Sequence, residues 1–231
     1  MAAFPLMLPG TSRPPKLVVF DLDHTLIACD ATILWTEFLY EKKIVTDPIW
    51  RQYDRDMVKS YAKGVLDIRD FCRKHAGAFR SIPEEKLHAL AQEFAKKKIA
   101  PLIFPDGKKW VKNALQANIP ACVLSASAAF IVKPIAKLFG LTDAMGIELA
   151  FKDGFCTGEI VGIPTFQEGK VERLSQRLTE AGIGFEDVLF FTDSRNDLPL
   201  AERAGYTVCV NPDAVLESAA RKNGWKVAEW K

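Results

Sequence analysis

The stretch Val18-Val19-Phe20-Asp21-Leu22-Asp23-His24-Thr25-Leu26 decides how this chain is interpreted. Its apolar start predicts a buried strand, which stops at two carboxylates, Asp21 and Asp23, only two positions apart. In an open α/β sheet, binding and catalytic groups are presented at such strand ends. Two acidic side chains at one strand end repel each other, which is costly unless a cation or a proton transfer uses them. The stretch therefore predicts metal-assisted chemistry on an anion.

The length, composition and net charge limit the kinds of protein and partner that this sequence allows. The chain has 231 residues with 48% hydrophobic residues, enough for one large domain or for a core with a modest insertion. Its formal net charge of +2 gives no strong electrostatic footprint for nucleic acid or a membrane surface. We therefore expect a small-molecule partner, and a monomer or homodimer.

The cysteines and the N-terminus bear on the compartment. Five scattered cysteines without a close pair argue against a disulfide framework and a zinc site, and favour a reducing, cytoplasmic location. Met1–Pro15 has no charged n-region, and its prolines interrupt any apolar core of a signal peptide. No later run reaches the 18 apolar residues of a membrane span.

Residues 30–105 are expected to form an all-helical insertion. Apolar residues recur there at helical spacing, with no convincing strand between them. Ser81 and Glu84 have the spacing of a capping box, which predicts that Ser81 caps a helix. Lys96-Lys97-Lys98 suits the solvated C-terminal end of the same helix.

From Asp106 onward, strands and helices alternate. We expect strands at 121–124, 188–191 and 207–210, helices at 107–117 and 171–181, and a hairpin of 147–151 and 155–161 that turns at Gly154. This pattern predicts an α/β fold with a Rossmann-like, mostly parallel sheet covered on both faces. Three strands end in polar residues: at Asp21, at Ser125-Ala126-Ser127, and at Asp193 to Asp197. Because such ends share one edge of the sheet, they can form a single site.

These residues carry a family resemblance. The segments Asp21-Leu22-Asp23-His24-Thr25, Ser125, Lys170 and Asp193-Ser194-Arg195-Asn196-Asp197 resemble, in order, the four motifs of the haloacid dehalogenase (HAD) superfamily of phosphohydrolases. The helical insertion is similar to the C1 cap of subfamily IB, the branch of phosphoserine phosphatase. The resemblance implies a HAD core of residues 1–29 and 106–231 with a cap of residues 30–105.

The first two carboxylates can divide the chemistry of a phosphomonoester hydrolase. A desolvated Asp21 can attack phosphorus to give an aspartyl phosphate. Asp23 can protonate the departing alcohol and then activate the water that hydrolyses the intermediate. Close carboxylates tend to have pKa values that are split in the way these two roles require.

The remaining motif residues are assigned to metal and phosphate. Mg²⁺ is expected on the carboxylates of Asp21 and Asp193 and on the backbone carbonyl of Asp23, with Asp197 just outside or reached through water. Lys170 is expected to neutralise developing charge and to keep Asp21 ionised. The residues expected at the substrate are Thr25, Asp30, Ser125, Ala126, Ser127 and Asn196. Ser127 has the alternative role of a helix cap, and Thr25 that of a support for the Asp21 loop.

The cap is expected to select the substrate. Phosphoserine phosphatases that resemble this chain carry a glutamate where Asp30 stands, so the assignment of phosphoserine is weakened. Arg69 or Arg73 can pair with a substrate carboxylate, or lie on the surface. Trp35, Trp50 and Tyr53 can wall a pocket for an imidazole, as in histidinol phosphate, or belong to the core. The side chain of His24 is expected to point away from the site.

Three functions remain open from the sequence. The first is a Mg²⁺-dependent phosphatase with a phosphoserine-like or histidinol-phosphate-like substrate. The second is a phosphotransferase of the same fold, which passes the phosphoryl group to an alcohol. The third is a phospho-acceptor or binding module, which has no need of Asp23 or of a cap.

Overall fold

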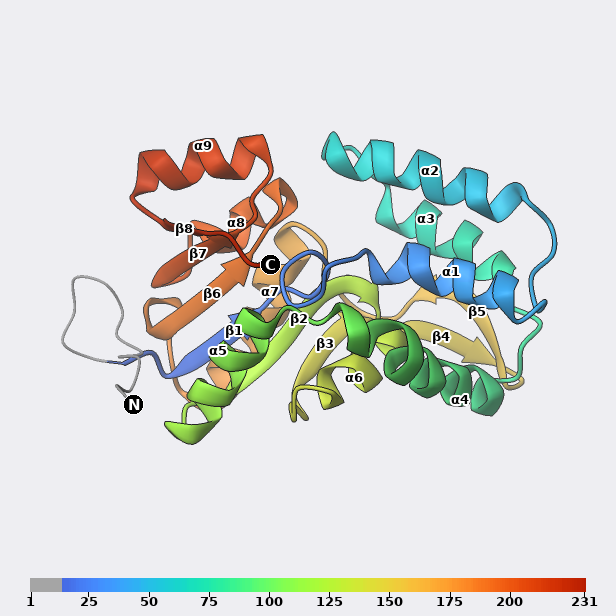
Figure 1. Ribbon diagram of the computed structural model, residues 1–231, viewed down its shortest axis with the longest axis horizontal. Coiled ribbons are helices and arrows are strands. Elements are labelled where there is room, and N and C mark those ends of the chain that lie inside the picture. The colour runs from blue at the N-terminus through green and yellow to red at the C-terminus, as the bar shows by residue number, and fades with distance from the viewer. Residues whose placement is uncertain (1–13) are drawn as a thin grey trace.

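The computed structural model describes residues 14–231, and its centre is a six-stranded parallel sheet (Figure 1). The strand order is β3-β2-β1-β6-β7-β8, and Val18 of β1 pairs with Ala121 of β2 and Leu189 of β6. The four residues of β1 are fully buried, as expected for a central parallel strand. The strands are β1 (Leu17–Phe20), β2 (Ala121–Ala128), β3 (Ala144–Ile147), β6 (Val188–Thr192), β7 (Tyr206–Val210) and β8 (Lys226–Ala228).

Alternate side chains of β1 face two layers of helices. Val18 and Phe20 pack into the cluster that contains residues of α5 and α6, whereas Leu17 and Val19 pack into the cluster that contains residues of α7 and α8. The predicted α/β fold is confirmed. The helices of this part are α5 (Pro105–Gln116), α6 (Ala129–Lys137), α7 (Glu168–Ala181), α8 (Leu198–Ala201) and α9 (Ala214–Asn223), with short 3-10 turns η4 (Phe185–Asp187) and η5 (Arg195–Asp197).

Four helices between β1 and α5 form a second region beside the sheet (Figure 1). They are α1 (Ala31–Glu41), α2 (Ile49–Ala62), α3 (Ile68–His75) and α4 (Glu84–Phe94), followed by a π-helical turn η2 (Ala95–Ile99), and the short turns η1 (Ala76–Ala78) and η3 (Ala100–Leu102) complete the region. The chain between β1 and α5 is thus helical as expected. The predicted lysine run lies in the π-helical turn, where Lys97 and Lys98 form ion pairs with Glu93 and Glu41.

The predicted hairpin is present, and it packs on the helical region. Its strands are β4 (Leu149–Lys152) and β5 (Phe155–Ile160). Arg73 of α3 forms an ion pair with Glu159, and Gly158 lies so close to the backbone of Arg73 that a Cβ atom would stand 2.9 Å from its Cα. The N–H of Glu84 donates to the carbonyl of Gly154 (2.8 Å). The prediction that Ser81 caps α4 is wrong, because α4 begins after Pro83, no side chain caps it, and the hairpin supplies this acceptor.

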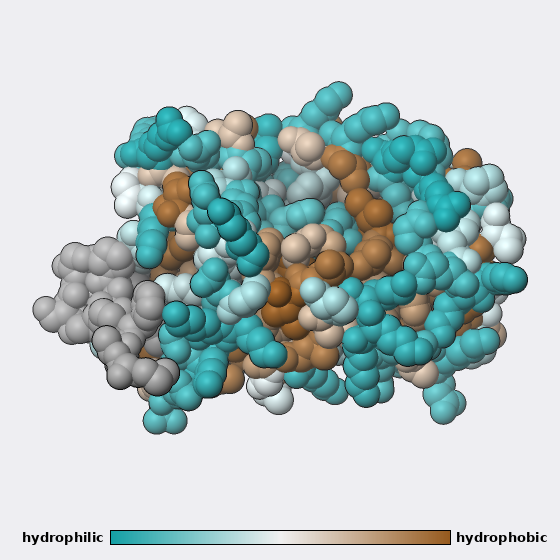
Figure 2. All heavy atoms as spheres, viewed as in Figure 1, coloured by the Kyte–Doolittle hydropathy of each residue, from teal (hydrophilic) through white to brown (hydrophobic). Residues whose placement is uncertain are grey.

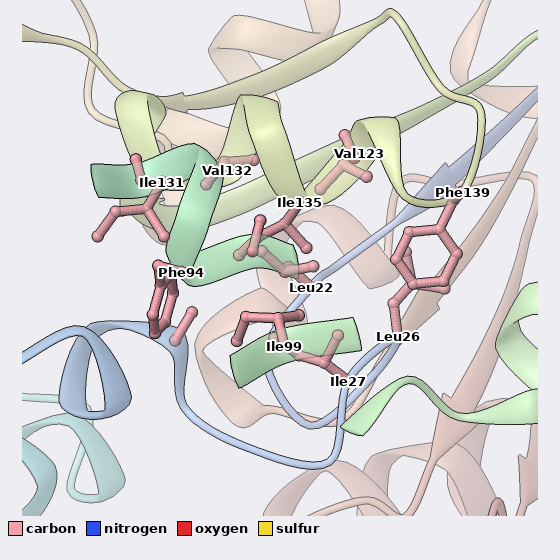
Figure 3. Packing of buried hydrophobic residues seen from close by; sticks show 14 of the residues in the cluster. Leu22, Leu26, Ile27, Phe94, Ile99, Val123, Ile131, Val132, Ile135 and Phe139 are labelled. Carbon is pink, nitrogen blue, oxygen red and sulfur yellow. The ribbon is translucent and has the colours of Figure 1, made fainter. Parts of the chain in front are cut away.

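One hydrophobic core joins the two regions. Leu22 and Leu26, just after β1, belong to the same cluster as Phe94 of α4 and Ile131 and Ile135 of α6 (Figure 3). In the space-filling view, hydrophobic residues gather at the junction of the two regions, and hydrophilic residues cover most of the helices around them (Figure 2). The helical region is therefore anchored directly behind the end of β1.

Three expectations bear on the compartment, and the structure covers two of them. All five cysteines are free, as predicted. Within residues 14–231, no helix has both the length and the apolar character to cross a bilayer. The expectation of no signal peptide concerns Met1–Pro15, of which residues 1–13 lie outside the described residues.

Candidate functional site

The ends of three adjacent strands bring the predicted residues together. Asp21 follows β1, and its backbone N–H donates to the carbonyl of Phe191 in β6 (2.9 Å). Asp193 and Asp197 follow β6 on the other side. On β2, the strand runs through to Ala128, so Ser125 and Ser127 lie inside it rather than beyond its predicted end, at a register irregularity. The single edge expected from the sequence is therefore formed.

Lys170, near the start of α7, lies between two carboxylates. Its side chain is 1% exposed, and its Nζ lies 2.7 Å from Asp21 Oδ1 and 2.7 Å from Asp197 Oδ1. Thr192 donates to Asp197 Oδ2 (2.8 Å). Burial alone would lower the pKa of Lys170, but the charges of Asp197 and Asp21 outweigh it and raise that pKa. Lys170 is thus a permanent buried cation that orients Asp21.

Asp23 is held from the opposite direction. Its Oδ1 accepts the N–H of Ala31 (2.6 Å), and its Oδ2 accepts the hydroxyls of Ser127 (2.8 Å) and Ser125 (3.2 Å). Burial, followed by the charge of Asp30, raises the pKa of Asp23 to about 6. This is the environment of a carboxyl that exchanges a proton near neutral pH.

Asp193 is the third carboxylate of the cluster. Burial, followed by the charges of Asp21 and Asp197, raises the pKa of Asp193 well above its usual value. The hydroxyl of Thr25 donates to Asp193 Oδ1 (3.3 Å), while its N–H donates to the carbonyl of Leu22. Thr25 thus supports both the loop after β1 and a carboxylate of the site.

The charge balance fits a divalent cation. Asp21 and Asp197 are buried and Asp193 is half-buried, and the three carboxylates lie around one buried lysine. Burial, followed by the charges of neighbouring carboxylates, raises their pKa values. Lys170 Nζ lies within 2.8 Å of both oxygens of Asp197, whereas it contacts Asp21 through Oδ1, so Asp21 and Asp193 are the better-placed ligands. Within the described residues, no three His, Cys, Asp or Glu side chains form a metal site on their own. A hard cation would therefore complete its shell with backbone and water oxygens, which is normal for Mg²⁺.

The serines of β2 form the wall next to Asp23. The N–H of Ser127 donates to Ser125 Oγ (3.0 Å), and the hydroxyl of Thr165 donates to the Ser125 carbonyl (2.5 Å). The alternative role of Ser127 as a helix cap is wrong, because α6 has Ala128 at its N-cap and no side-chain cap. Ser127 contacts Asp23 and the hydroxyl of Thr32 instead (3.1 Å).

A cavity of about 200 Å³ opens over these groups. Its floor includes Asp21, Asp23, Ala126, Ser127 and Asp193. Its outer wall comes from the helical region and is mainly apolar, with Ile33, Met57, Tyr61, Leu66, Ile68 and Phe71 among the lining residues.

Asp30 and His24 both line the cavity, the first as expected and the second against expectation. Asp30 lines the cavity as predicted, and it also caps α1 by accepting the N–H of Ile33 (2.9 Å). Burial raises the pKa of Asp30. His24 was expected to point away, but it lines the same cavity, in a backbone conformation with φ of +57°.

The cavity wall has no fixed cation. Within residues 14–231, no lysine or arginine lines it. Of the two arginines considered for a substrate carboxylate, Arg69 is exposed, and Arg73 pairs with Glu159 with 55% of its side chain exposed. Their surface alternative is therefore the one that the structure shows.

The aromatic residues expected at the cavity are not its walls. Trp35 is fully buried against Phe38, Phe94 and Phe130, in the core alternative left open by the sequence. Trp50 and Tyr53 stack on each other and do not line the cavity. The aromatic lining residues are Tyr61 and Phe71, which the sequence reasoning missed because their helical spacing is that of ordinary core residues.

Asn196 does not point at an open phosphate position. Its Nδ2 donates to the carbonyl of Tyr61 (3.0 Å), and its Oδ1 accepts from Gln167 (3.1 Å). Asn196 therefore contacts α2 and is not among the lining residues of the cavity, and its expected role at the substrate stays a prediction. Gln167 was also missed, and no motif or spacing singles it out.

Comparison with known proteins decides the family. The family model described as haloacid dehalogenase-like hydrolase matches residues 18–202. The chain belongs to the haloacid dehalogenase-like hydrolase family. It is 35% identical over 220 residues to the histidinol-phosphatase of Neisseria meningitidis serogroup C (strain 8013), which spans 94% of this chain and 99% of that protein. The predicted class, a phosphatase of this family, is confirmed.

Solved structures support the same fold. A protein with unknown function from Bordetella pertussis Tohama I superposes with a TM-score of 0.83 at 32% identity, covering 91% of this chain and 96% of that one. A phospho-aspartyl intermediate analogue of phosphoserine phosphatase superposes with a TM-score of 0.67 at 22% identity, covering 93% of each chain. The second likeness concerns the fold alone.

Proposed function

We propose that this member of the family is a Mg²⁺-dependent phosphatase of a small phosphomonoester whose leaving group is cationic or apolar and has no carboxylate, as in histidinol phosphate. The observation that carries the substrate class is the cavity, with an apolar wall, acidic residues and no lysine or arginine. A substrate carboxylate buried there would lack a counter-charge, which costs several kcal/mol. A protonated amine instead meets Asp30.

In the first step, Asp21 is the nucleophile. Its Oδ1 is fixed by Lys170, and its other oxygen attacks phosphorus in line with the departing alcohol. The P–O bond to the alcohol breaks, and Asp23 donates its proton to the alkoxide oxygen. The products are the free alcohol and an aspartyl phosphate.

In the second step, Asp23 reverses its role. The carboxylate that remains takes a proton from a water molecule, whose oxygen attacks the phosphorus of the intermediate. The bond between phosphorus and Asp21 breaks, which releases inorganic phosphate and restores both carboxyls. The hydroxyls of Ser125 and Ser127 keep Asp23 beside the phosphorus in both steps.

The residues that would hold Mg²⁺ are the carboxylates of Asp21 and Asp193 and the backbone carbonyl of Asp23. Bound there, the cation neutralises phosphoryl charge. Asp197 instead holds Lys170, with Thr192 as its support. We assign the phosphoryl oxygens to Ala126 and Ser127, which line the cavity, and to the buried Ser125 between Asp23 and Ser127, while Thr25 supports Asp193.

The alternatives differ in observable ways. A phosphoserine phosphatase would need a cationic partner for the substrate carboxylate, and among residues 14–231 the cavity wall offers His24 but no lysine or arginine. A phospho-acceptor module has no use for the proton-exchanging environment of Asp23 or for the cavity. A phosphotransferase uses the same first step, and an added acceptor alcohol distinguishes it, because the product is then a new ester instead of phosphate.

The test is phosphate release from a matched set of esters, with Mg²⁺ and with excess EDTA. Phosphoserine and phosphoethanolamine differ only by the carboxylate, and histidinol phosphate adds an imidazole. We expect kcat/KM to be highest for histidinol phosphate, lower for phosphoethanolamine and lowest for phosphoserine, with no turnover in EDTA. Faster turnover of phosphoserine than of phosphoethanolamine would refute the substrate class.

A further inference from the structure

Two side-chain amides attach the C-terminal end of α2 to the edge of the sheet that carries Asp21, Ser125 and Asp193, which we call the catalytic edge. Asn196 Nδ2 donates to the carbonyl of Tyr61 (3.0 Å), and Gln167 Nε2 donates to the carbonyl of Gly64 (3.2 Å). The Tyr61 carbonyl also accepts the N–H of Gly64 (2.9 Å), and an oxygen with two lone pairs can take the Asn196 amide as a second donor. The helical region thus meets the sheet edge through specific hydrogen bonds at this point.

Gln167 also holds the side-chain amide of Asn196 in place. The same Nε2 donates to Asn196 Oδ1 (3.1 Å), which orients the Asn196 amide toward α2. Gln167 precedes Lys170 by three residues, and Asn196 precedes Asp197 by one. The two amides are therefore tied to the two members of the buried ion pair below them.

The backbone of Gln167 is strained. Its φ of +48° and ψ of −123° are close to those of the first central residue of a type II′ turn, where glycine is usual. The turn is fixed on both sides, because Thr165 donates to the carbonyl of Ser125 and the N–H of Lys170 donates to the carbonyl of Gln167. A strained non-glycine residue held in this way indicates a function for its side chain.

The first half of α2 is anchored within the helical region, because Arg51 pairs with Glu37 (2.7 Å) and the Trp50 ring packs against Gly77. Asp54 and Met57 are the only residues of α2 that are buried. Yet α2 supplies Met57, Val58, Tyr61 and Ala62 to the cavity wall, and the Tyr61 ring packs against Phe166, next to Gln167 (5.8 Å between centroids). The second half of α2, which lies over the cavity, therefore depends on the attachment at its C-terminal end for its position.

We propose that Gln167 is a positioning residue that latches the end of α2 onto the catalytic edge and so closes the substrate cavity. The latched state holds Tyr61 over the carboxylates and keeps water from the cavity, whereas release of α2 opens a path for substrate and product. The effect on turnover rests on the proposed phosphatase function, but the latch itself does not.

The test compares Gln167→Gly and Gln167→Ala with Gln176→Ala, an exposed glutamine of the same helix α7. Gln167→Gly removes the amide and relieves the strained backbone, so the thermal midpoint is expected to be unchanged or raised. Amide hydrogen exchange of residues 61–66 is measured in each protein by mass spectrometry. Relative to the wild type, we expect it to accelerate at least about 10-fold in both Gln167 variants and to be unchanged in the control, because the end of α2 opens more often once Gly64 loses its hydrogen bond from Gln167.

Kinetics with histidinol phosphate complete the test. Loss of two hydrogen bonds predicts a fall in kcat/KM of about 10- to 100-fold in Gln167→Gly, without loss of stability. Unchanged exchange of residues 61–66 in Gln167→Gly would overturn the latch whatever the activity. Accelerated exchange with no turnover of any ester by the wild type would instead refute the phosphatase and leave the latch standing.

Discussion

The catalytic edge and the helical region differ in how their buried ionisable side chains are paired. At the edge, Lys170 lies within 2.7 Å of both Asp21 and Asp197, and Asp23 accepts three hydrogen bonds. In the helical region, Asp54 of α2 is 4% exposed, and neither of its carboxylate oxygens has a hydrogen-bond partner. The close partners at the edge fix the positions of its side chains, whereas a buried carboxyl without a hydrogen bond lowers the free energy of unfolding.

This difference teaches where the chemistry and the selectivity are expected to lie. The carboxylates that we propose to act on phosphorus are fixed by short contacts from β1, β2, β6 and α7. The wall that meets the leaving group comes from helices with apolar side chains and a sparsely buried α2. Substitutions at the edge should therefore reduce turnover of every ester, whereas substitutions in the helical region should change preference or stability.

The largest effect is expected from Lys170→Met. It leaves Asp21 and Asp197 buried without their cation, so the free energy of unfolding should fall by about 3–5 kcal/mol. Denaturant unfolding measures this, and phosphate release should fall by at least about 10³-fold for all esters. The exposed Lys222→Met is the control. Equal stability of the two variants would show that the buried ion pair does not specify the edge.

Asp23→Asn should slow turnover by about 10²- to 10⁴-fold, because it removes the proton donor and the base. The loss should be greater for an alkyl phosphate than for p-nitrophenyl phosphate, whose leaving group needs no proton. Steady-state kinetics with both esters measure the ratio, and Asp153→Asn on the exposed hairpin turn is the control. An equal loss for both esters would contradict the role as general acid.

Ile68→Arg should change substrate preference without abolishing turnover. Ile68 begins α3 and lines the cavity, so an arginine there supplies the missing partner for a substrate carboxylate. We expect the kcat/KM ratio of phosphoserine to phosphoethanolamine to rise about 10-fold. Val65→Arg adds the same charge outside the cavity. A ratio that rises equally in both variants would assign the effect to general charge rather than to the wall.

Asp54→Asn tests the cost of the buried acid in the helical region. Burial raises the pKa of Asp54 to about 7, while the Thr36 hydroxyl of α1 and Arg55 oppose the rise and the charges of Asp30 and Glu37 add to it. His75 of α3 lies 3.6 Å away, but burial lowers its pKa to about 4, so it is neutral. The folded state thus holds a proton that the unfolded state releases, and stability falls as pH rises from about 4 to 7.

The variant should therefore be more stable than the wild type at pH 8, by roughly 1–3 kcal/mol, and the gain should vanish near pH 4. Denaturant unfolding at both pH values measures it, with the exposed Asp56→Asn as the control on the same helix. A gain that is equal at pH 4 and pH 8 would exclude titration of Asp54 as its cause.

The catalytic edge could be predicted from the sequence because its logic is local. Each strand is an apolar run, and Asp21 and Asp193 stand directly after one. Parallel pairing then brings these ends together whatever the rest of the chain does. Even the longer course of β2 past Ser125 did not move that residue away from Asp23.

The helical region could not be predicted in the same way because its details depend on distant contacts. Ser81 fails as a cap because the hairpin, some seventy residues later, supplies Gly154 as an acceptor to α4. Trp35 and Phe71 both recur at helical spacing, yet one is in the core and the other lines the cavity. Helical periodicity shows that a face is buried, but not whether it is buried against protein or against a ligand.

The most direct measurement of the central claim is a search for phosphate bound covalently to Asp21. The Asp23→Asn enzyme is mixed with p-nitrophenyl phosphate and Mg²⁺, quenched in acid and digested, because this ester permits the first step and the variant delays the second. We predict one phosphate per chain on the peptide that contains Asp21, and none in the Asp21→Asn, Asp23→Asn double variant. Release of p-nitrophenol in a single turnover without label on Asp21 would contradict the account.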